Sequence, residues 1–451
     1  MDRKIHSIIL ITVDSLRSDH LSIYGYNRRT SPFIDKLAKS GILLTQTFAN
    51  APYTTASINS MLTSRYPLMG TERYTNTNRG KTLPEVLKEN GFYTLGFHSN
   101  PWFLIYHFGK GFDIFLDPYS EHHRKQKFTT KVMNFAMKKI LGKIKAPYAT
   151  AEELNEAVLK TLTQLKDYKK LFLWIHYMDV HEPYLPKTWH FTRKKLSYSY
   201  VLNLMRKKNE SPESLTDSER ELILRLYDDK IWELDKELSH LVNDLSDHLD
   251  LEKTLIIFTA DHGEAFGERG AYGHCANNNL NLHRELLHIP MIFWSENNDT
   301  LSKFYHIEQS NRISKIFSLM DLGPTILNLL GIKIPSSFLG RDLINDKIQY
   351  VISQGVVAPD PNIEKYVKTN ERAHAITNVE HKLIWWEQRE YTELYNLVAD
   401  PLEQQNIANE NLELVHSLKS IIKREISQYS KPEEDEKLKK AIKNLKLKGK
   451  I

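Results

Sequence analysis

Residues 254–264 read Thr-Leu-Ile-Ile-Phe-Thr-Ala-Asp-His-Gly-Glu, an apolar run followed directly by an acid, an imidazole and a glycine. The first six residues have the length and apolar character of a buried strand. Polar side chains just after a strand favour a ligand site at its carboxyl end. We expect Asp261 and His262 to form a metal corner, with Gly263 allowing a tight turn. Taken alone, the same residues also fit a helix cap and an ordinary loop histidine.

Similar apolar runs recur along the chain, separated by longer amphipathic segments. This alternation is typical of an α/β fold, a sheet between helices. Because ligands bind at strand carboxyl ends, we expect Asp14, Asn100 and Asp179, which each follow a run, to converge with Asp261. The expected strands are residues 8–13, 93–98, 171–176, 254–259 and 289–294, and the expected helices are residues 31–40, 83–90, 151–166 and 218–244.

Shorter strand-like pieces replace this pattern in the last quarter of the chain. Residues 375–386 and 391–397 are expected strands, and a helix is expected through about residue 428. We therefore predict a catalytic domain over 1–350, a small α+β subdomain over 351–430 and a lysine-rich tail over 431–451.

Composition and charge narrow the function classes. A chain of 451 residues that is 41% hydrophobic and 26% charged is globular with a sizeable core, which excludes a disordered protein. The formal net charge is +5, but residues 437–451 carry seven lysines and no acid, so the remainder nets −2. We therefore expect no nucleic-acid partner. We expect segment 437–451 to be a solvated terminal helix, with peripheral contact to an acidic membrane or polymer as the alternative.

The single cysteine and the short apolar runs bear on location. Cys275 has no second cysteine with which to form an internal disulfide, which is typical of a reducing compartment. Residues 8–13 are too short to span a membrane and lead straight into Asp14. We therefore expect a cytoplasmic protein without a transmembrane segment.

Eleven pieces of the sequence occur in an order that is far more specific than any one of them. They are residues 13–19, 24–26, 30–38, 51–57, 62–67, 111–113, 176–184, 259–264, 321–325, 393–397 and 400–401. Together they resemble the sulfatase branch of the alkaline phosphatase superfamily, from the first expected strand to about Ile407. The resemblance implies that superfamily's fold, a large, mixed, mostly parallel sheet between helices with a small C-terminal α+β subdomain.

The resemblance also implies a divalent metal held by Asp14, Asp261 and His262, with the nucleophile's oxygen as a further ligand. In this family the nucleophile opens a twelve-residue signature ending in Thr-Gly-Arg, and counting back from Arg65 places it at Thr54. A threonine hydroxyl needs a metal to lower its pKa before it attacks at neutral pH. Mostly oxygen ligands with one imidazole suit Mn, Zn, Mg or Ca, and the residue types leave that choice open.

The chain departs from the sulfatase pattern at several positions. Sulfatases carry a cysteine or serine that is converted to formylglycine, and Thr54 cannot be converted in this way. The arginine that usually follows is Ile58, the second aspartate of the opening pair is Ser15, and residues 96–100 replace a lysine-bearing Gly-Lys-Trp-His segment. These departures argue against sulfate hydrolysis.

Two histidines are predicted to contact substrate oxygens or to protonate the leaving group, since an imidazole does either near neutral pH. His181 matches the family's histidine in the His-Glu-Pro segment. His274 stands where relatives place a lysine or histidine.

Other polar residues are predicted to bind substrate. These are Asn100, Arg17 and His176. Alternatives stay open for two residues. Arg17 is also suited to bracing the Asp14 loop by ion pairing, and Asp179 to orienting His181 or to joining it at a second metal.

The residues together predict a metal-dependent hydrolase or transferase. It would cleave an anionic phosphate or sulfate ester, on a glycan or lipid headgroup, through a covalent intermediate on Thr54, with phosphoesters favoured. A sulfuric ester hydrolase is the first alternative. A catalytically silent binder of an anionic glycan or lipid headgroup is the second, but a binder needs no nucleophile.

Overall fold

The computed structural model describes residues 5–69, 80–100, 102–105, 107–118, 148–165, 168–274, 281–356 and 371–429. Cys275 and the predicted tail 431–451, with its lysine-rich segment 437–451, lie outside the described residues. Within the described ranges, none of the helices combines the length and the apolar character that crossing a bilayer requires.

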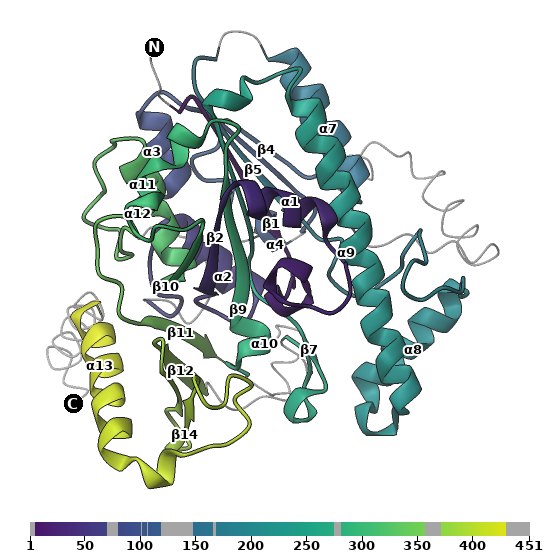
Figure 1. Ribbon diagram of the computed structural model, residues 1–451, viewed down its shortest axis with the longest axis vertical. Helices are drawn as coiled ribbons and strands as arrows, with labels where there is room; N and C mark the ends of the chain where they lie inside the picture. The colour runs from purple at the N-terminus through teal and green to yellow at the C-terminus, as the bar shows by residue number, and fades with distance from the viewer. Residues whose placement is uncertain are drawn as a thin grey trace, which may run out of the picture.

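An eight-stranded sheet in the order β10-β2-β9-β6-β1-β5-β3-β4 forms the centre of the molecule (Figure 1). Only β9 among its described strands runs antiparallel to its neighbours. The predicted mixed, mostly parallel sheet between helices is therefore confirmed. The strands are β1 (Ser7–Val13), β2 (Ile42–Phe48), β3 (Tyr93–His98), β4 (Ile114–Leu116), β5 (Leu171–Tyr177), β6 (Thr254–Ala260), β9 (His288–Trp294) and β10 (Arg312–Ser318).

The register of the central strands brings distant residues to one edge. Val13 pairs with both Tyr177 and Ala260, so β1, β5 and β6 end at the same level. The residues that follow, Asp14 and Asp261 among them, therefore leave the sheet side by side. In Figure 1 this edge is marked by β7 (Ala265–Phe266), which follows directly after Glu264.

Helices cover both faces of the sheet. Helices α1 and α7 each contact α9 on one face, and α2 contacts α3 and α12 on the other. Capping boxes begin four of them: three at Thr82, Thr150 and Thr216, each with a glutamate three residues later, and one at Ser318 with Asp321. The helices are α1 (Pro32–Ser40), α2 (Thr54–Thr63), α3 (Leu83–Glu89), α7 (Ala151–Gln164), α9 (Asp217–Leu245) and α12 (Leu319–Leu329).

Further helices and one strand complete the part of the chain described around the large sheet. They are α4 (Trp102–Ile105), α8 (Tyr198–Glu210), α10 (Arg284–Leu287), α11 (Ser302–Tyr305) and β8 (Tyr272–Gly273), which pairs with β7.

A four-stranded antiparallel sheet follows the large one, with α13 (Leu412–Tyr429) packed on it. Its strands are β11 (Val351–Val356), β12 (Arg372–Thr377), β13 (His381–Trp386) and β14 (Tyr391–Asn396). The single strand expected over 375–386 is wrong: it is two strands, because the side chain of Asn378 accepts the backbone N–H groups of Glu380 and His381 and closes a turn.

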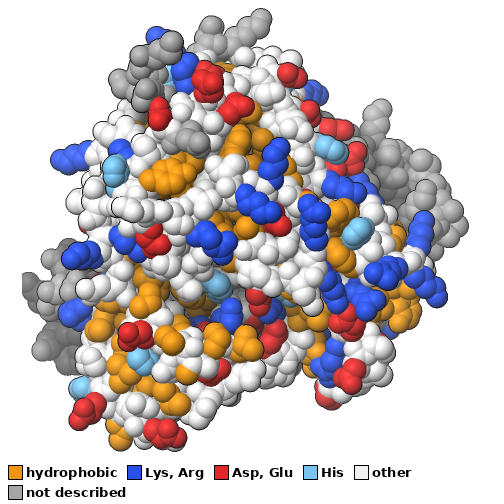
Figure 2. Space-filling view, viewed as in Figure 1, with side chains coloured by type: hydrophobic (Ala, Val, Ile, Leu, Met, Phe, Trp, Pro, Cys, Tyr) orange, Lys and Arg blue, Asp and Glu red, His pale blue; other side chains and the backbone are white. Residues whose placement is uncertain are grey.

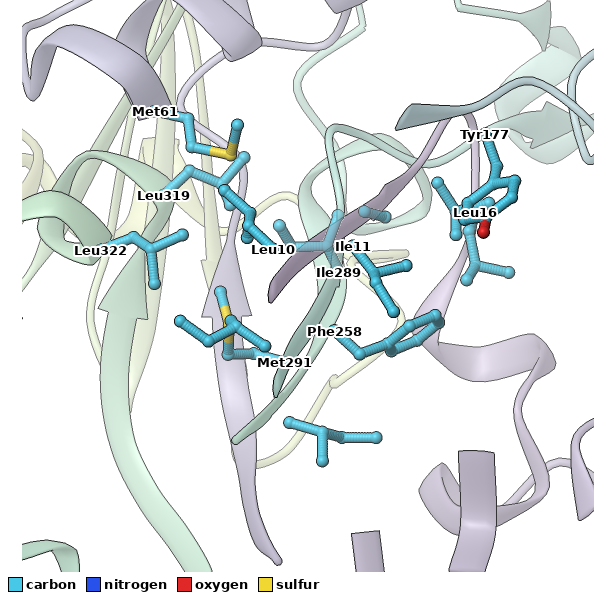
Figure 3. Packing of buried hydrophobic residues seen from close by; sticks show 14 of the residues in the cluster. Leu10, Ile11, Leu16, Met61, Tyr177, Phe258, Ile289, Met291, Leu319 and Leu322 are labelled. Carbon is cyan, nitrogen blue, oxygen red and sulfur yellow. The ribbon is translucent and has the colours of Figure 1, made fainter. Parts of the chain in front are cut away.

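The main core lies between the large sheet and its helices. Leu10, from β1, is completely buried among residues of β9, α2 and α12 (Figure 3). The face seen in Figure 2 carries charges of both signs, with hydrophobic side chains among them, as is usual for a folded domain.

The core predicts a large cost for truncating Leu10. Leu10→Ala should lower the free energy of unfolding by about 2–5 kcal/mol, because buried surface is lost and a cavity remains. Leu412→Ala is the matched control, since 68% of Leu412 is exposed, and it should change stability by less than about 0.5 kcal/mol. Urea denaturation measures both. Equal losses would contradict the assigned core.

Candidate functional site

Asp14 and Asp261 leave the carboxyl ends of neighbouring strands, β1 and β6, and both are completely buried. Ser15 bridges them: its hydroxyl donates to Asp14 Oδ1 at 2.8 Å, and its backbone N–H donates to Asp261 Oδ1 at 3.3 Å. Ser15 has φ of +60°, so the backbone adopts the left-handed region to make both contacts. Ser15, which replaces the second aspartate of the family's pattern, therefore holds Asp14 and Asp261 in place.

Thr54 is the first residue of α2, and its hydroxyl points at this corner. Its Oγ1 lies 3.2 Å from Asp14 Oδ2 and 3.1 Å from His262 Nε2. The His262 Nδ1–H donates to the Gly263 carbonyl at 2.8 Å, so Nε2 offers a lone pair to the corner. Ser57, one turn along α2, donates to the Asp261 carbonyl at 2.6 Å and ties the helix to the strand end.

His176, on β5, approaches the corner from the other side. Its Nε2 lies 3.4 Å from Asp14 Oδ2, and its Nδ1 is 2.8 Å from the Thr12 hydroxyl. Thr12 also accepts the indole N–H of Trp174 at 2.9 Å, which fixes the hydroxyl. His176 is thus placed among the acids, where it is better suited to ligate a cation than to contact substrate.

The corner fits a divalent cation. Ligand atoms of Asp14, His176 and Asp261 lie within 4.8 Å of one another, as do those of Asp14, His262 and His274. Within the described structure, Asp261 Oδ2 is buried without a hydrogen-bond partner. Buried carboxylates need a compensating positive charge. The free oxygen of Asp261 and the Nε2 lone pair of His262, 3.5 Å apart, are the kinds of ligand atom that a divalent cation binds.

The electrostatics of the corner agree with this fit. Burial, with the charge of Asp14 adding to it, raises the pKa of Asp261 to about 7. Burial also works against ionisation of Asp14, but the neighbouring His181, His176 and His262 outweigh it and hold its pKa well below the usual range. Burial lowers the pKa of His262, which keeps the imidazole neutral and able to ligate.

His181 and His274 lie together beside the corner, with their ring centroids 5.1 Å apart. His181 donates from Nδ1 to the Glu182 carbonyl at 2.7 Å. His274 Nδ1 lies 3.2 Å from Glu264 Oε1, and its ring is 4.5 Å from that of His262. The structure thus places both predicted histidines within the site.

Glu264 is a further site residue, for which the sequence pattern predicted no role. It is buried, and the charge and hydrogen bond of His274 overcome the effect of burial and lower the pKa of Glu264 to about 2. The sequence signal for Glu264 was its position two residues after His262, which places its carboxylate close to the same metal-binding residues.

Other predicted residues are placed differently. The Arg17 guanidinium contacts Asp19 at 2.8 Å and Glu268 at 2.6 Å, which is the bracing alternative. Asn100 caps α4 by accepting the Trp102 N–H at 3.0 Å. Asp179 lies 3.6 Å from Lys230, and the structure shows no contact that would orient His181.

Gly263 is required by a close approach of two chain segments. Its φ is not positive, so the tight turn expected there is not what requires the glycine. A Cβ atom at this position would lie 2.0 Å from the Glu285 carbonyl oxygen. Any side chain would therefore push apart the strand end with His262 and the segment with Glu285.

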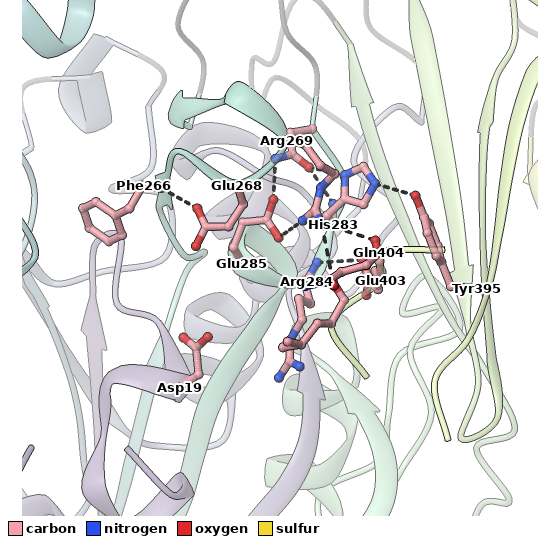
Figure 4. Close-up of polar contacts among 12 residues, drawn as sticks. Asp19, Phe266, Glu268, Arg269, His283, Arg284, Glu285, Tyr395, Glu403 and Gln404 are labelled. Atoms are coloured by element: carbon pink, nitrogen blue, oxygen red, sulfur yellow. Dashed lines mark hydrogen bonds and ion pairs between the residues drawn. The ribbon is translucent and has the colours of Figure 1, made fainter. Parts of the chain in front are cut away.

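Polar contacts fasten that segment to the C-terminal sheet (Figure 4). His283 Nε2 lies 2.8 Å from Glu393 Oε2 and 3.2 Å from the Tyr395 hydroxyl. The Arg284 N–H donates to Glu403 at 3.1 Å, and Arg269 pairs with Glu285. The C-terminal sheet therefore supports one wall of the site.

Residues 6–332 match the sulfatase family model. This chain belongs to the sulfatase family. Iduronate 2-sulfatase of Homo sapiens is 23% identical over 397 residues, which cover 73% of this chain and 70% of that protein. An arylsulfatase of Clostridium perfringens is 21% identical over 475 residues, covering 93% and 94%.

Solved structures of sulfatase-family type share the fold. The phosphonate monoester hydrolase of Agrobacterium radiobacter superposes with a TM-score of 0.71 at 16% identity, covering 94% of this chain and 96% of that one. An enzyme in complex with its substrate D-glucosamine-2-N,6-O-disulfate superposes with a TM-score of 0.70 at 18% identity, covering 96% and 100%. Sulfatase-family members are metal-dependent hydrolases of ester bonds, so the predicted enzyme class is confirmed.

The site predicts loss of metal when the corner is altered. Asp261→Asn and His262→Ala should each lower the affinity of the protein for a divalent metal ion about 100-fold or more. The fold should persist, because both side chains lie at a strand end outside the core. Metal analysis with circular dichroism measures both. Asp250→Asn, an exposed acid just before the same strand, is the control. Full metal occupancy in either site variant would exclude that residue.

Metal binding should also depend on pH. The raised pKa of Asp261, about 7, means that the metal-free protein carries a proton there at lower pH. A cation must displace that proton, so affinity for Mn²⁺ should fall about tenfold per pH unit below 7 and level off above it. Calorimetry in buffers of different ionisation enthalpy measures the released proton. A constant affinity between pH 5.5 and 8 would contradict this assignment.

Proposed function

We propose that this sulfatase-family enzyme cleaves phosphoesters in preference to sulfate esters, through a covalent intermediate on Thr54. The observation that carries the proposal is the position of the Thr54 hydroxyl, which lies 3.2 Å from Asp14 and 3.1 Å from His262. A nucleophile must stand beside groups that activate it. Thr54 does so at the start of α2, held in place by the tether of Ser57.

Asp14, Asp261, His262 and His176 would hold the divalent cation. When bound, it would lower the pKa of the Thr54 hydroxyl and neutralise charge on the attacked group. Asp14 Oδ2 and His262 Nε2 flank the hydroxyl, so its proton has acceptors within hydrogen-bond distance.

The first half of the reaction exchanges one ester bond for another. Thr54 Oγ1 forms a bond to phosphorus while the bond to the leaving oxygen breaks. That oxygen takes a proton from an imidazole, and His181 and His274 are the two beside the corner. In the second half, water or an acceptor alcohol attacks phosphorus, gives its proton to an imidazole and releases Thr54.

The identity of Thr54 favours phosphorus over sulfur. A formylglycine hydrate can release sulfate by collapsing to the aldehyde, so sulfur is attacked only once. Threonine has no such exit and needs a second in-line attack, which a cation and nearby histidines assist at phosphorus. Ile58, where the family's signature carries an arginine, is completely buried and offers no positive charge to a sulfate.

The substrate class follows from the same site. An anionic ester, on a glycan or a lipid headgroup, supplies the charge that the cation and imidazoles complement. The fold is shared with a phosphonate monoester hydrolase, which acts at phosphorus. It is shared equally with an enzyme that has a disulfated glucosamine substrate, so sulfate esters belong in the test.

Matched nitrophenyl phosphodiester, phosphonate, phosphate and sulfate esters test the proposal with Mn²⁺, Zn²⁺, Mg²⁺ and Ca²⁺. The best phosphorus substrate should exceed the sulfate in kcat/KM by at least about tenfold. Thr54→Ala should lose about 10³-fold or more, whereas Thr55→Ala, its neighbour on α2, should stay close to wild type. Mass spectrometry should find a phosphoryl group on Thr54 after quenching. A preference for sulfate, or wild-type rates in Thr54→Ala, would refute the proposal.

A further inference from the structure

Lys208 carries a buried charge that the proposed reaction does not use. It lies in the last turn of α8 and is 0% exposed. Its Nζ is 2.7 Å from Glu182 Oε2, and the neighbouring Asn209 donates to Glu182 Oε1 at 2.9 Å. Helix α8 therefore holds both oxygens of one carboxylate. Burying a lysine charge costs free energy that pairing with a partly exposed glutamate offsets only in part, so the presence of this lysine points to a role in placing groups.

Glu182 connects this ion pair to His181. The Glu182 carbonyl accepts the His181 Nδ1–H at 2.7 Å. Because a carbonyl oxygen only accepts, Nδ1 carries a proton and Nε2 is the nitrogen left for the site. Tyr148 holds the other side of this turn by donating to the His181 carbonyl at 2.8 Å. The side chain of Glu182 is thus fixed by α8, and its main chain fixes the imidazole.

A second path leads from Lys208 to His274. The Lys208 ammonium lies 5.8 Å from the centre of the Tyr184 ring. The Tyr184 hydroxyl donates to Glu264 Oε2 at 3.3 Å, and Glu264 contacts His274 Nδ1. One lysine therefore stands behind both imidazoles.

We propose that Lys208 is a positioning residue that aims His181 at the leaving oxygen through Glu182, with a weaker effect on His274 through Tyr184. This inference rests on the proposed function. As the bond between phosphorus and the leaving oxygen breaks and the bond to Thr54 Oγ1 forms, the proton on His181 Nε2 passes to that oxygen. Lys208 touches neither substrate nor cation.

The test is the dependence of the loss on the leaving group. Lys208→Met is assayed with two phosphoesters. The leaving oxygen of the 2,4-dinitrophenyl ester needs no proton, whereas that of the matched phenyl ester does. With the phenyl ester kcat should fall about 10- to 100-fold, as for a misplaced catalytic group. With the dinitrophenyl ester it should fall less than threefold, and KM should stay within twofold for both. Lys208→Arg should recover part of the phenyl rate.

Lys207→Met is the matched control. Lys207 is adjacent on α8, but its ammonium pairs with Glu219 at 2.7 Å near the surface, away from Glu182. Both kcat values of Lys207→Met should equal those of wild type.

Three results would overturn the positioning role. They are equal losses with the two esters, no loss with either, and the same loss in Lys207→Met. If Lys208→Met does not fold, Lys208→Met combined with Glu182→Gln removes both charges of the pair, and the same ratio of losses is expected. A wild-type enzyme inactive on both esters would refute the proposed function itself, before any variant is compared.

Discussion

Two buried carboxylates, Asp14 and Asp261, repel each other at neighbouring strand ends, and the site is organised around that repulsion. Ser15 donates to both of them, and His176 and His262 approach from opposite sides. None of these hydrogen bonds supplies a full positive charge. A divalent cation, on which sulfatase-family members depend, would supply that charge between the two acids. The parallel register of β1 and β6 enforces the contact, so the sheet and the chemistry have a common cause.

Strands β1, β3, β5, β6 and β9 were predictable because each contains a continuous apolar run, as expected of strands covered on both faces. Three strands of the large sheet, β2, β4 and β10, were not predicted. On β10, Arg312 and Ser314 are exposed, because a strand at a sheet edge tolerates polar residues. The hairpin between β12 and β13 was missed for a different reason. The sequence does carry a polar break, since Asn378 and Glu380 flank Val379 in the turn. That break was not interpreted as a turn, and the hydrogen bonds that Asn378 accepts show that the chain reverses there.

The site could be predicted as a set of residues, but not as an arrangement. Asp14, Thr54, Asp261 and His262 were identified, and the structure brings them together. The direction in which a side chain points depends on neighbours from distant segments. The Arg17 guanidinium pairs with Glu268, and the Glu264 carboxylate contacts His274, ten residues later in the sequence. Sequence position near a strand end indicates that a residue is close to the site, whereas its role depends on contacts of this kind.

The residues of the site come from distant parts of the chain, and this affects the order in which the protein folds during synthesis. The hydrogen bond from Ser15 to Asp261 joins residues 246 positions apart, and β1 lies between two strands that are both synthesised long after it. Contacts of such long range form slowly. During synthesis on the ribosome, β1 therefore emerges as an apolar segment well before either of the strands that pair with it. The residues that would hold a cation, from Asp14 to His262, are all present only once more than half of the polypeptide has emerged, so the site can be assembled only late in synthesis.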